Sequence, residues 1–243
     1  MGLSQDPKGN YIMVMELAPF GSLCTYLNNI ITWYDGLKVL LDISKGLLSL
    51  HNSSLTHRDF HPGNLLFKSK SNLLITDLGL CKPANENSQS DNIYGVMPYV
   101  APEVLKGKPY TQKADIYSFG MVMYFVATGE QPFSNCAHDE YLVLRICNGI
   151  RPEINESVAP KCYIDLMEKC WNSNSDKRPD ITEIEESIKS FIYKDEQFEK
   201  VEDYRKKRLL SIKNYQLTTH PQAIYKSQFL NPYTESMKMD FTK

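Results

Sequence analysis

The sequence predicts an α+β protein whose larger part is helical. Residues 114–127 are apolar on nearly every side, which is typical of a helix buried at the centre of a helical lobe. Residues 36–52 place leucines three and four positions apart, the spacing of an amphipathic helix. Short apolar runs at 11–17, 65–67 and 73–75 indicate strands, and the first of them is expected to be buried.

The composition is that of a globular protein, with 42% hydrophobic and 23% charged residues. The formal charge of −2 argues against a strongly basic nucleic-acid binder, and no apolar run approaches the ~20 residues that cross a bilayer. The six cysteines include no C-x-x-C pair, and the start of the sequence has no secretory apolar core. We therefore expect a reduced cytoplasmic protein with inert cysteines and with neither a nucleic-acid nor a membrane partner.

Turns and further helices separate these segments. The turn at Phe20–Ser22 precedes a short helix, and residues 56–64 form a loop dense in polar and turn residues. Residues 83–92 are polar and contain helix and strand breakers, so a mobile loop is expected there. Three more helices are expected near 137–148, 160–171 and 180–193.

The C-terminal part of the chain differs in composition from the rest. Residues 195–213 have an acidic half followed by the basic run 205–208, and Glu202 with Lys206 forms an i, i+4 pair. This pattern predicts a solvated helix, on which the basic run is an exposed face rather than a localisation signal. Residues 214–243 lack periodicity and are expected to be a disordered tail.

Five motifs follow one another in a characteristic order. Residues 57–64 read His-Arg-Asp-Phe-His-Pro-Gly-Asn, and Asp-Leu-Gly stands at 77–79. Ala-Pro-Glu follows at 101–103, DIYSFG at 115–120 and CWNSNSDKRPD at 170–180. In this order and spacing the set resembles the signature of the eukaryotic protein kinase family, with the character of its tyrosine-kinase-like group.

The resemblance implies a protein kinase-like fold and covers roughly residues 1–193 of the chain. Residues 1–17 would be a remnant of the small β lobe, consisting of its last strands and the entry to the hinge. Residues 18–193 would form the mainly helical large lobe. Residues 194–243 would add the charged helix and the disordered tail.

The resemblance also assigns chemical roles, with ATP and Mg²⁺ as cofactors and a protein as substrate. Asp59 would accept the proton of the substrate hydroxyl as catalytic base. Asn64 and Asp77 would be the magnesium ligands, since hard cations prefer oxygen donors. Arg58 would reach a phosphorylated activation segment. Candidate acceptors in that segment are Ser88, Ser90 and Tyr94.

Nucleotide contacts follow from the same resemblance. Met15 would be the gatekeeper at the back of the adenine pocket. The Glu16 carbonyl and the Ala18 backbone would hydrogen-bond the adenine ring. Leu66, the second residue after Asn64, would form the floor of the pocket.

Five more residues receive structural roles or remain open. By resemblance, Asp115 steadies the backbone of the catalytic loop, and Glu103 pairs with Arg178. His57 is expected to pack and to hydrogen-bond rather than to act as an acid or base. His61 is either a surface residue or a contact on the substrate side.

Two departures from the family pattern concern the acceptor residue. His61 stands where serine/threonine kinases usually carry lysine, and Val96 stands where they carry threonine. Gly63 stands where tyrosine kinases carry a characteristic arginine. Serine/threonine specificity is preferred on the group resemblance alone.

A third departure lies before the hinge. The chain contains no G-x-G, and the only lysine ahead of the hinge strand is Lys8, in the expected turn before that strand. Because losing one preorganised donor costs about 100–1,000-fold in rate, transfer by this chain is expected to be very weak. A strand with at most one neighbour is also marginal, so an incomplete gene model with an upstream start is expected.

Two other functions remain open from the sequence. A degenerate, kinase-like scaffold would dock partners on its helical lobe, and the missing lysine favours it, whereas the intact Asp59, Asn64 and Asp77 do not. A small-molecule kinase of the aminoglycoside or choline type would share HRDFHPGNLL at 57–66 but lacks an Ala-Pro-Glu segment.

Overall fold

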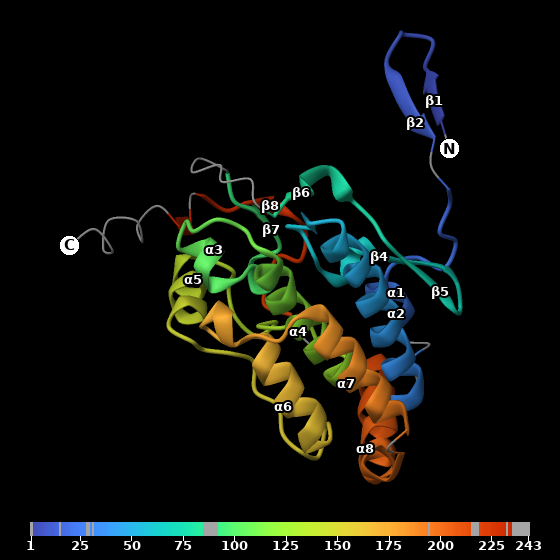
Figure 1. The fold of residues 1–243 in the computed structure, drawn as a ribbon, viewed down its shortest axis with the longest axis vertical. Coiled ribbons are helices and arrows are strands. Elements are labelled where there is room, and N and C mark those ends of the chain that lie inside the picture. Colours follow the sequence, from blue (N-terminus) through green and yellow to red (C-terminus); the bar gives the residue numbers. More distant parts are fainter. Residues whose placement is uncertain are drawn as a thin grey trace, which may run out of the picture.

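A helix buried on every side stands at the centre of the computed structural model (Figure 1). This helix, α4 (Gln112–Thr128), has every residue from Ala114 to Thr128 buried, as the apolar pattern predicts. It ends at Gly129, whose φ of 77° is a left-handed conformation that glycine adopts readily. The structure describes residues 2–14, 16–27, 30, 32–84, 92–193, 195–214, 219–231, 233 and 234.

Helix α6 (Lys161–Cys170) packs closely against α4. A Cβ added at Gly120 would lie 2.9 Å from the Cβ of Cys170, so glycine permits this close approach. The phenolic O–H of Tyr163 donates to the Met123 carbonyl at 2.7 Å and ties the two helices together. The predicted helix at 160–171 is therefore confirmed as a layer of the core.

Helix α2 (Trp33–Asn52) packs along α7 (Ile181–Tyr193). It begins before the predicted residue 36, because Thr32 and Asp35 form a capping box that supplies partners for the first free backbone N–H groups. Both helices bury one apolar face against the core, as their periodicity predicts.

The remaining elements are short. The other helices of the lobe are α1 (Leu23–Tyr26), α3 (Pro102–Leu105) and α5 (Glu140–Cys147). Single 3₁₀ turns are η2 (Pro62–Asn64), η3 (Leu78–Leu80), η4 (Met97–Tyr99) and η5 (Ser175–Lys177). The two predicted strands after the catalytic loop are an antiparallel hairpin of β4 (Leu65–Ser69) and β5 (Asn72–Ile75), and β3 (Leu55–Thr56) pairs with β6 (Lys82–Pro83).

The N-terminal hairpin corrects one sequence prediction. Strand β2 (Tyr11–Val14) pairs with β1 (Gly2–Gln5), and Lys8 lies in the turn between them, as expected. The sequence predicts a buried strand at 11–17, but every residue of β2 is exposed. In Figure 1 the hairpin projects away from the helical body, so none of the described elements covers its apolar side chains.

Helix α8 (Asp195–Asn214) corrects a second prediction. Its basic run is not simply a solvated face, because Arg205 is only 1% exposed and donates to the carbonyls of Val126 and Ala127 at 2.8 and 3.1 Å. Burial lowers the pKa of Arg205 to about 10. Arg208 donates to the Thr128 carbonyl, so both arginines satisfy carbonyls at the C-terminal end of α4.

Part of the C-terminal tail is also ordered, contrary to the sequence expectation. Strand β8 (Gln228–Phe229) pairs antiparallel with β7 (Tyr94–Gly95), and the two lie side by side in Figure 1. Leu230 is fully buried. Residues 219–231 form an extended segment, here called the strap, which distant contacts hold in place. Because the strap is not a helix, its sequence has no periodicity from which its order could be predicted.

One buried histidine anchors the strap. His138 is 3% exposed, its Nε2 lies 3.3 Å from the Phe133 carbonyl, and its Nδ1 lies 2.9 Å from the Ile224 carbonyl and 3.0 Å from the Ile224 backbone nitrogen. The Tyr225 ring packs edge-on against it with centroids 4.8 Å apart. Burial lowers the pKa of His138, and the charge of His220 lowers it further, although the two backbone contacts and Asp139 act in the opposite direction.

A bidentate ion pair links the Ala-Pro-Glu segment to the distal helices, as expected. The Nη1 and Nη2 atoms of Arg178 lie 2.6 and 2.7 Å from the two carboxylate oxygens of Glu103. Arg178 also donates to the carbonyls of Asn172 and Lys113, so its charge is fully partnered in a buried setting. All six cysteines are free thiols. Among the described residues, no helix has both the length and the apolarity to cross a bilayer.

We expect Glu103→Ala to lower the free energy of unfolding by about 3–5 kcal/mol, because it leaves the buried Arg178 charge without its partner. Lys161→Ala is the control, since it removes an exposed pair with Asp165 and should change stability little. Denaturant unfolding measures both variants. Equal stability of Glu103→Ala and the wild type would contradict the role of this pair.

We expect docking of the strap to weaken progressively as the pH falls below about 6.5, the ordinary pKa of histidine. Released His138 binds a proton more readily than docked His138, so docking is strongest above that pH and weakens below it. The amide NMR signals of Ile224 and Leu230, followed through a pH titration, measure the change. His138→Asn keeps an acceptor but does not titrate, and an equal pH response in this variant would refute the assignment.

Candidate active site

The carboxylate of Asp115 fixes the start of the loop at residues 57–64, which the family resemblance identifies as the catalytic loop. Its Oδ2 accepts from the His57 backbone N–H at 2.9 Å, and its Oδ1 accepts from the Arg58 N–H at 3.1 Å. The His51 ring lies 3.0 Å from Oδ2, a partner that the sequence analysis does not identify. Arg58 has a φ of 71°, and these bonds hold that left-handed conformation in place. The steadying role expected of Asp115 is therefore confirmed.

His57 connects the loop to the residue before Asp77. It is fully buried, its Nε2 donates to the Thr76 carbonyl at 3.0 Å, and its Nδ1 accepts from the Asp59 backbone N–H at 3.3 Å. Both ring nitrogens are thus used in hydrogen bonds. The predicted packing and hydrogen-bonding role of His57 is confirmed.

Asp59 and Asn64 face each other across the loop. The Asn64 side-chain amide donates to the Asp59 backbone carbonyl at 2.9 Å and to its carboxylate Oδ2 at 3.3 Å. These bonds use the nitrogen of the Asn64 amide, so its oxygen is the atom that the side chain can offer to a cation.

The Asp59 carboxylate is 5% exposed but is stabilised as the anion. Burial alone would raise its pKa, but the hydrogen bonds and charges of neighbouring groups outweigh burial and lower the pKa below its ordinary value. The neighbours are His61, Ser227 and His57. At neutral pH Asp59 is therefore ionised and can accept a proton.

His61 is buried against Asp59, so the reading as a surface residue is wrong, and a contact on the substrate side stays a prediction. Its Nε2 lies 3.6 Å from Oδ1 of Asp59, and its Nδ1 accepts from the Gly63 N–H at 3.1 Å, which leaves the ring proton on Nε2. A Cβ added at Gly63 would lie 2.6 Å from the His61 ring. The lack of a side chain at Gly63 thus makes room for the His61 ring.

Gly95 also belongs to the site, although the sequence analysis assigns it no role. Its φ is 143°, and an added Cβ would lie 2.9 Å from Cγ2 of Val100 and 3.5 Å from Oδ1 of Asp59. The signal in the sequence was its position just ahead of the segment that ends in Ala-Pro-Glu. The glycine lets β7 approach the Asp59 carboxylate.

The β4–β5 hairpin brings Asn64 and Asp77 together. Leu65 pairs with Ile75, and the backbone N–H and hydroxyl of Thr76 donate to the Asn64 carbonyl at 2.9 and 3.0 Å. Asp77 follows directly, exposed and with a φ of 59°. The described residues contain no group of three or more His, Cys, Asp or Glu with metal-site geometry. An amide oxygen and a free carboxylate nevertheless fit Mg²⁺, which keeps several waters and binds one or two protein oxygens beside substrate phosphates.

The expected nucleotide residues lie along β4. The Phe67 N–H donates to the Gly21 carbonyl at 2.8 Å, and the Gly21 N–H donates to the Ala18 carbonyl at 3.2 Å. Ser22 forms an isolated bridge with Leu66, which is half-buried.

The remaining expected contacts of the nucleotide site are less enclosed. The exposed Glu16 forms an ion pair with Lys68 through its side chain at 2.6 Å. This ion pair does not involve the backbone carbonyl of Glu16, which is the group expected to bind adenine. Met15 lies outside the described residues.

The structure describes Arg58 but only part of the activation segment, which runs from Asp77 to Glu103. The Arg58 side chain is buried, its Nε donates to Thr56, and its guanidinium lies over the Tyr110 ring at 5.3 Å. The Tyr110 hydroxyl donates to the Tyr94 carbonyl at 3.0 Å, so Arg58 lies close to that segment. Ser88, Ser90 and most of the loop expected at 83–92 lie outside the described residues.

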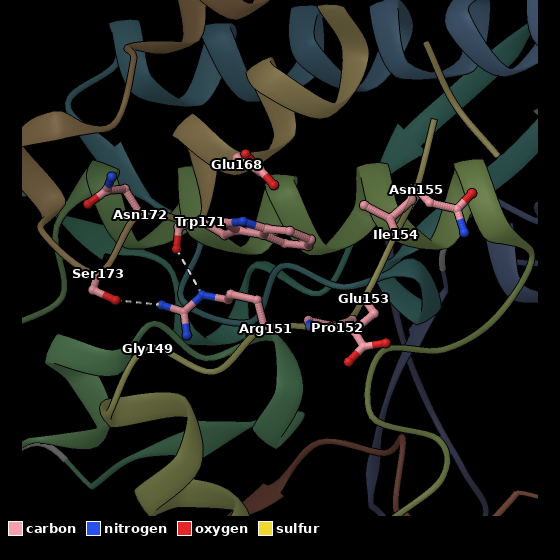
Figure 2. A pocket seen from close by; sticks show the side chains of 10 residues that line it. All are labelled: Gly149, Arg151, Pro152, Glu153, Ile154, Asn155, Glu168, Trp171, Asn172 and Ser173. Carbon is pink, nitrogen blue, oxygen red and sulfur yellow. Dashed lines mark hydrogen bonds between the residues drawn. The ribbon is translucent and has the colours of Figure 1, made fainter. Parts of the chain in front are cut away.

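A pocket of about 710 Å³ is separate from these residues. Figure 2 shows Arg151 extended across it, with hydrogen bonds from Nε to the Trp171 carbonyl and from Nη2 to the Ser173 hydroxyl. Arg151 also donates to the carbonyls of Ile146 and Ile150. The guanidinium is therefore used to hold the loop after α5, and the pocket shares no residue with the candidate site.

Comparison with known proteins agrees with this geometry. Residues 3–188 match the model of the protein kinase domain. The serine/threonine-protein kinase STY17 of Arabidopsis thaliana is 32% identical over 75% of this chain and 32% of its own length. The dual serine/threonine and tyrosine protein kinase of Gallus gallus is 36% identical over 59% of this chain and 15% of its own length. The chain thus spans less than a third of the length of these curated relatives.

We expect Asp115→Asn to lower the free energy of unfolding by about 1–3 kcal/mol, because the amide replaces an acceptor that faces a buried backbone N–H. Asp203→Asn, at an exposed position of α8, is the matched control and should be neutral. Denaturant unfolding measures both. If the two variants are equally stable, Asp115 does not hold the loop.

Proposed function

The chain belongs to the protein kinase family, and from that premise we propose that it transfers the γ-phosphoryl group of ATP to a serine or threonine hydroxyl of a protein. The observation that carries this proposal is the ionised Asp59 carboxylate, held beside Asn64 on a loop that Asp115 fixes. Such positioning is what phosphoryl transfer requires of a protein, because the reaction needs little covalent chemistry from it. Membership of the protein kinase family disfavours the small-molecule kinase.

Asp59 orients the acceptor hydroxyl and takes its proton as the oxygen attacks phosphorus. Its lowered pKa keeps it ionised at neutral pH, so it is ready to accept that proton. Asn64 and Asp77 would hold Mg²⁺ through the amide oxygen and the carboxylate, and the ion would supply positive charge beside the phosphates.

The segment along β4 binds the adenine end of the nucleotide. The Glu16 carbonyl and the Ala18 backbone meet the ring, and Leu66 covers one face of it. We place Met15 behind the ring. Residues 1–17 then supply the last strands of the small lobe, 18–193 the large lobe and 194–243 the charged helix and tail.

Serine/threonine specificity is supported by the surroundings of Asp59. The Nε2–H of His61 stands at 3.6 Å from the carboxylate, where serine/threonine kinases place a lysine donor. Gly63 stands at the position where tyrosine kinases carry their characteristic arginine, so this chain lacks that arginine. The relatives are a serine/threonine kinase and a dual serine/threonine and tyrosine kinase, and both classes include serine/threonine transfer.

A second candidate is a catalytically weak scaffold. It is favoured by Lys8, which lies in the turn between β1 and β2 with its backbone N–H bonded to Asp6. Lys8 in that exposed turn is poorly placed to clamp nucleotide phosphates. A scaffold would keep the helical lobe and would gain no stability from Mg-ATP.

We expect Mg-ATP to raise the melting temperature, because a ligand that binds only the folded chain stabilises it, by about 2.7 kcal/mol at 100 times its Kd. Asp77→Asn should lose most of this shift through the metal. Asp59→Asn should keep the shift but lower transfer to a protein acceptor by about 100-fold or more.

The exposed Asp203→Asn variant is again the control and should match the wild type in both assays. Wild-type turnover by Asp59→Asn would refute its role. No shift at saturating Mg-ATP would instead support the scaffold.

A further inference from the structure

The strap, residues 219–231, pairs with the activation segment beside Asp59. Strand β8 is antiparallel to β7, and Gln228 stands directly opposite Gly95. A Cβ added at Gly95 would lie 3.5 Å from Oδ1 of Asp59, so this face of the ladder is turned toward the candidate base. Residues directly opposite each other in an antiparallel pair have their side chains on the same face. The strap therefore presents Gln228 to the catalytic loop.

Residues on the C-terminal side of Gln228 anchor the strap. The Leu230 N–H donates to the Ile93 carbonyl at 2.8 Å, and the Asn231 side chain accepts from the Ile93 N–H at 2.6 Å. The Leu230 side chain is fully buried and belongs to the hydrophobic core. These contacts fix the strap on the backbone just ahead of β7.

Residues on the N-terminal side of Gln228 anchor the strap to a different part of the lobe. The Tyr225 hydroxyl donates to the Pro132 carbonyl at 2.8 Å. The His138 N–H donates to the Gln222 carbonyl at 3.0 Å, and the Tyr225 ring packs against the His138 ring. Anchors on both sides leave the strap little freedom to slide, so the register of Gln228 with Gly95 is fixed.

The surroundings of Asp59 fit a group that the docked strap does not supply. The Nε2 of His61, 3.6 Å from Oδ1 of Asp59, is buried and has no hydrogen-bond partner among the described residues. Buried polar groups are nearly always bonded, so an unbonded donor here points to a missing acceptor. A hydroxyl oxygen accepts from such a donor and has a proton to give to a carboxylate. Gln228 has no hydroxyl, and its side-chain nitrogen is likewise buried and unbonded within the described structure.

We propose that the strap is a pseudosubstrate of its own chain, a segment that occupies the protein-substrate site without being able to react. In this arrangement Gln228 stands in the place of the phosphoacceptor. The inference rests on the proposed kinase function and concerns the regulation of the same site. Because the glutamine side chain has no hydroxyl, the docked strap excludes protein substrates and is not consumed by ATP.

The strap also indicates which peptides the site accepts. Pairing with an exposed strand is a general way to bind an extended peptide, since backbone bonds give affinity and side-chain pockets give specificity. Leu230 follows Gln228 by two residues and is fully buried, so it fills an apolar pocket of the lobe. A peptide substrate in the same register carries a serine or threonine opposite Gly95 and a large apolar residue two positions after it.

The strap can be displaced by such a substrate. The unbonded nitrogen of Gln228 weakens docking, because a buried donor without a partner has lost its bond to water. Strap and substrate compete for one ladder, so the strap raises the apparent KM by the inverse of the fraction of open chains. Saturating substrate removes the strap, and kcat is therefore unaffected.

The first test gives the strap a hydroxyl at the proposed acceptor position. In Gln228→Ser the introduced oxygen forms a bond to the γ-phosphorus of ATP, its proton passes to Asp59, and ADP leaves with the bridging oxygen. We expect phosphate at position 228 after incubation with Mg-ATP, located by mass spectrometry. The rate per chain should not change on dilution, because acceptor and base belong to one molecule.

Lys226→Ser is the matched control for the first test. It places a hydroxyl at an exposed strap position about 7 Å away along the chain, and it should acquire no phosphate there. Phosphate at Ser227 or at position 226, in place of position 228, would overturn the register. A rate per chain that rises with protein concentration would overturn docking within one chain.

The second test releases the strap. Leu230→Asp places a charge at a fully buried apolar position and should detach the strap, whereas Lys226→Ala, at an exposed position, should not. The acceptor is a synthetic peptide of residues 219–231 that carries Gln228→Ser. If at least nine chains in ten are closed, Leu230→Asp lowers the KM for this peptide by about 10-fold or more and leaves kcat unchanged. An equal KM in Leu230→Asp and the wild type would overturn the inference.

Docking is also measurable without catalysis. The Ile93 amide, which donates to Asn231 in the docked strap, should be protected from hydrogen exchange in the wild type and in Lys226→Ala. In Leu230→Asp it should exchange at least 10-fold faster. An Ile93 amide that exchanges equally fast in the wild type and in Leu230→Asp would overturn the docking of the strap on the activation segment.

Dephosphorylated casein, a general protein acceptor, separates the two possible failures. If the chain phosphorylates casein, but Gln228→Ser acquires no phosphate and Leu230→Asp does not lower the KM for the peptide, this inference is overturned and the proposed function stands. If neither the wild type nor any variant phosphorylates an acceptor, the proposed function fails and this inference fails with it.

Discussion

The site depends on one buried carboxylate. Asp115 stands in the first turn of α4, where it is 2% exposed, and its two oxygens bind the backbone of His57 and Arg58. Backbone N–H groups buried without a partner cost about 1–3 kcal/mol each, so these two bonds favour the conformation that the loop adopts. Asp59 is the next residue after Arg58, so the same bonds fix its position. The placement of the candidate base thus depends on α4, whose residues from Ala114 to Thr128 are all buried.

The other end of α4 is held as firmly by different chemistry. The helix ends with unpaired carbonyls in an apolar setting, and Arg205 and Arg208 of α8 donate to three of them. The Arg205 guanidinium also lies over the Trp33 ring at 4.6 Å, and the backbone N–H of Trp33 donates to the Glu202 carboxylate. Helix α8 is therefore part of the packed helical lobe. A charged helix outside the motif-bearing part of the chain contributes directly to the rigidity of the active-site scaffold.

Local patterns in the sequence predict what local forces determine. The all-round apolar run predicted α4, and the leucine spacing predicted α2. The motif order predicted the loop from His57 to Asn64, its bonds to Asp115, and the pair of Glu103 with Arg178. Three predictions failed because distant partners decide them: β2 is exposed although it is apolar, Arg205 is buried although it is charged, and the strap is ordered although it lacks periodicity. The surface reading of His61 failed for the same reason, because only the fold shows its ring against Asp59 and over Gly63.

Gly95 links the ordered part of the tail to the loop that carries Asp59. A Cβ added at Gly95 of β7 would lie 3.5 Å from Oδ1 of Asp59 and 2.9 Å from Cγ2 of Val100, so a residue without a side chain lets β7 lie this close to the carboxylate. The same glycine pairs with Gln228 of β8, and directly paired residues of an antiparallel ladder have their side chains on one face of it. Gln228 is half-buried there, whereas its neighbour Ser227 is exposed. The pairing that orders this part of the tail therefore depends on the same glycine that brings β7 against Asp59.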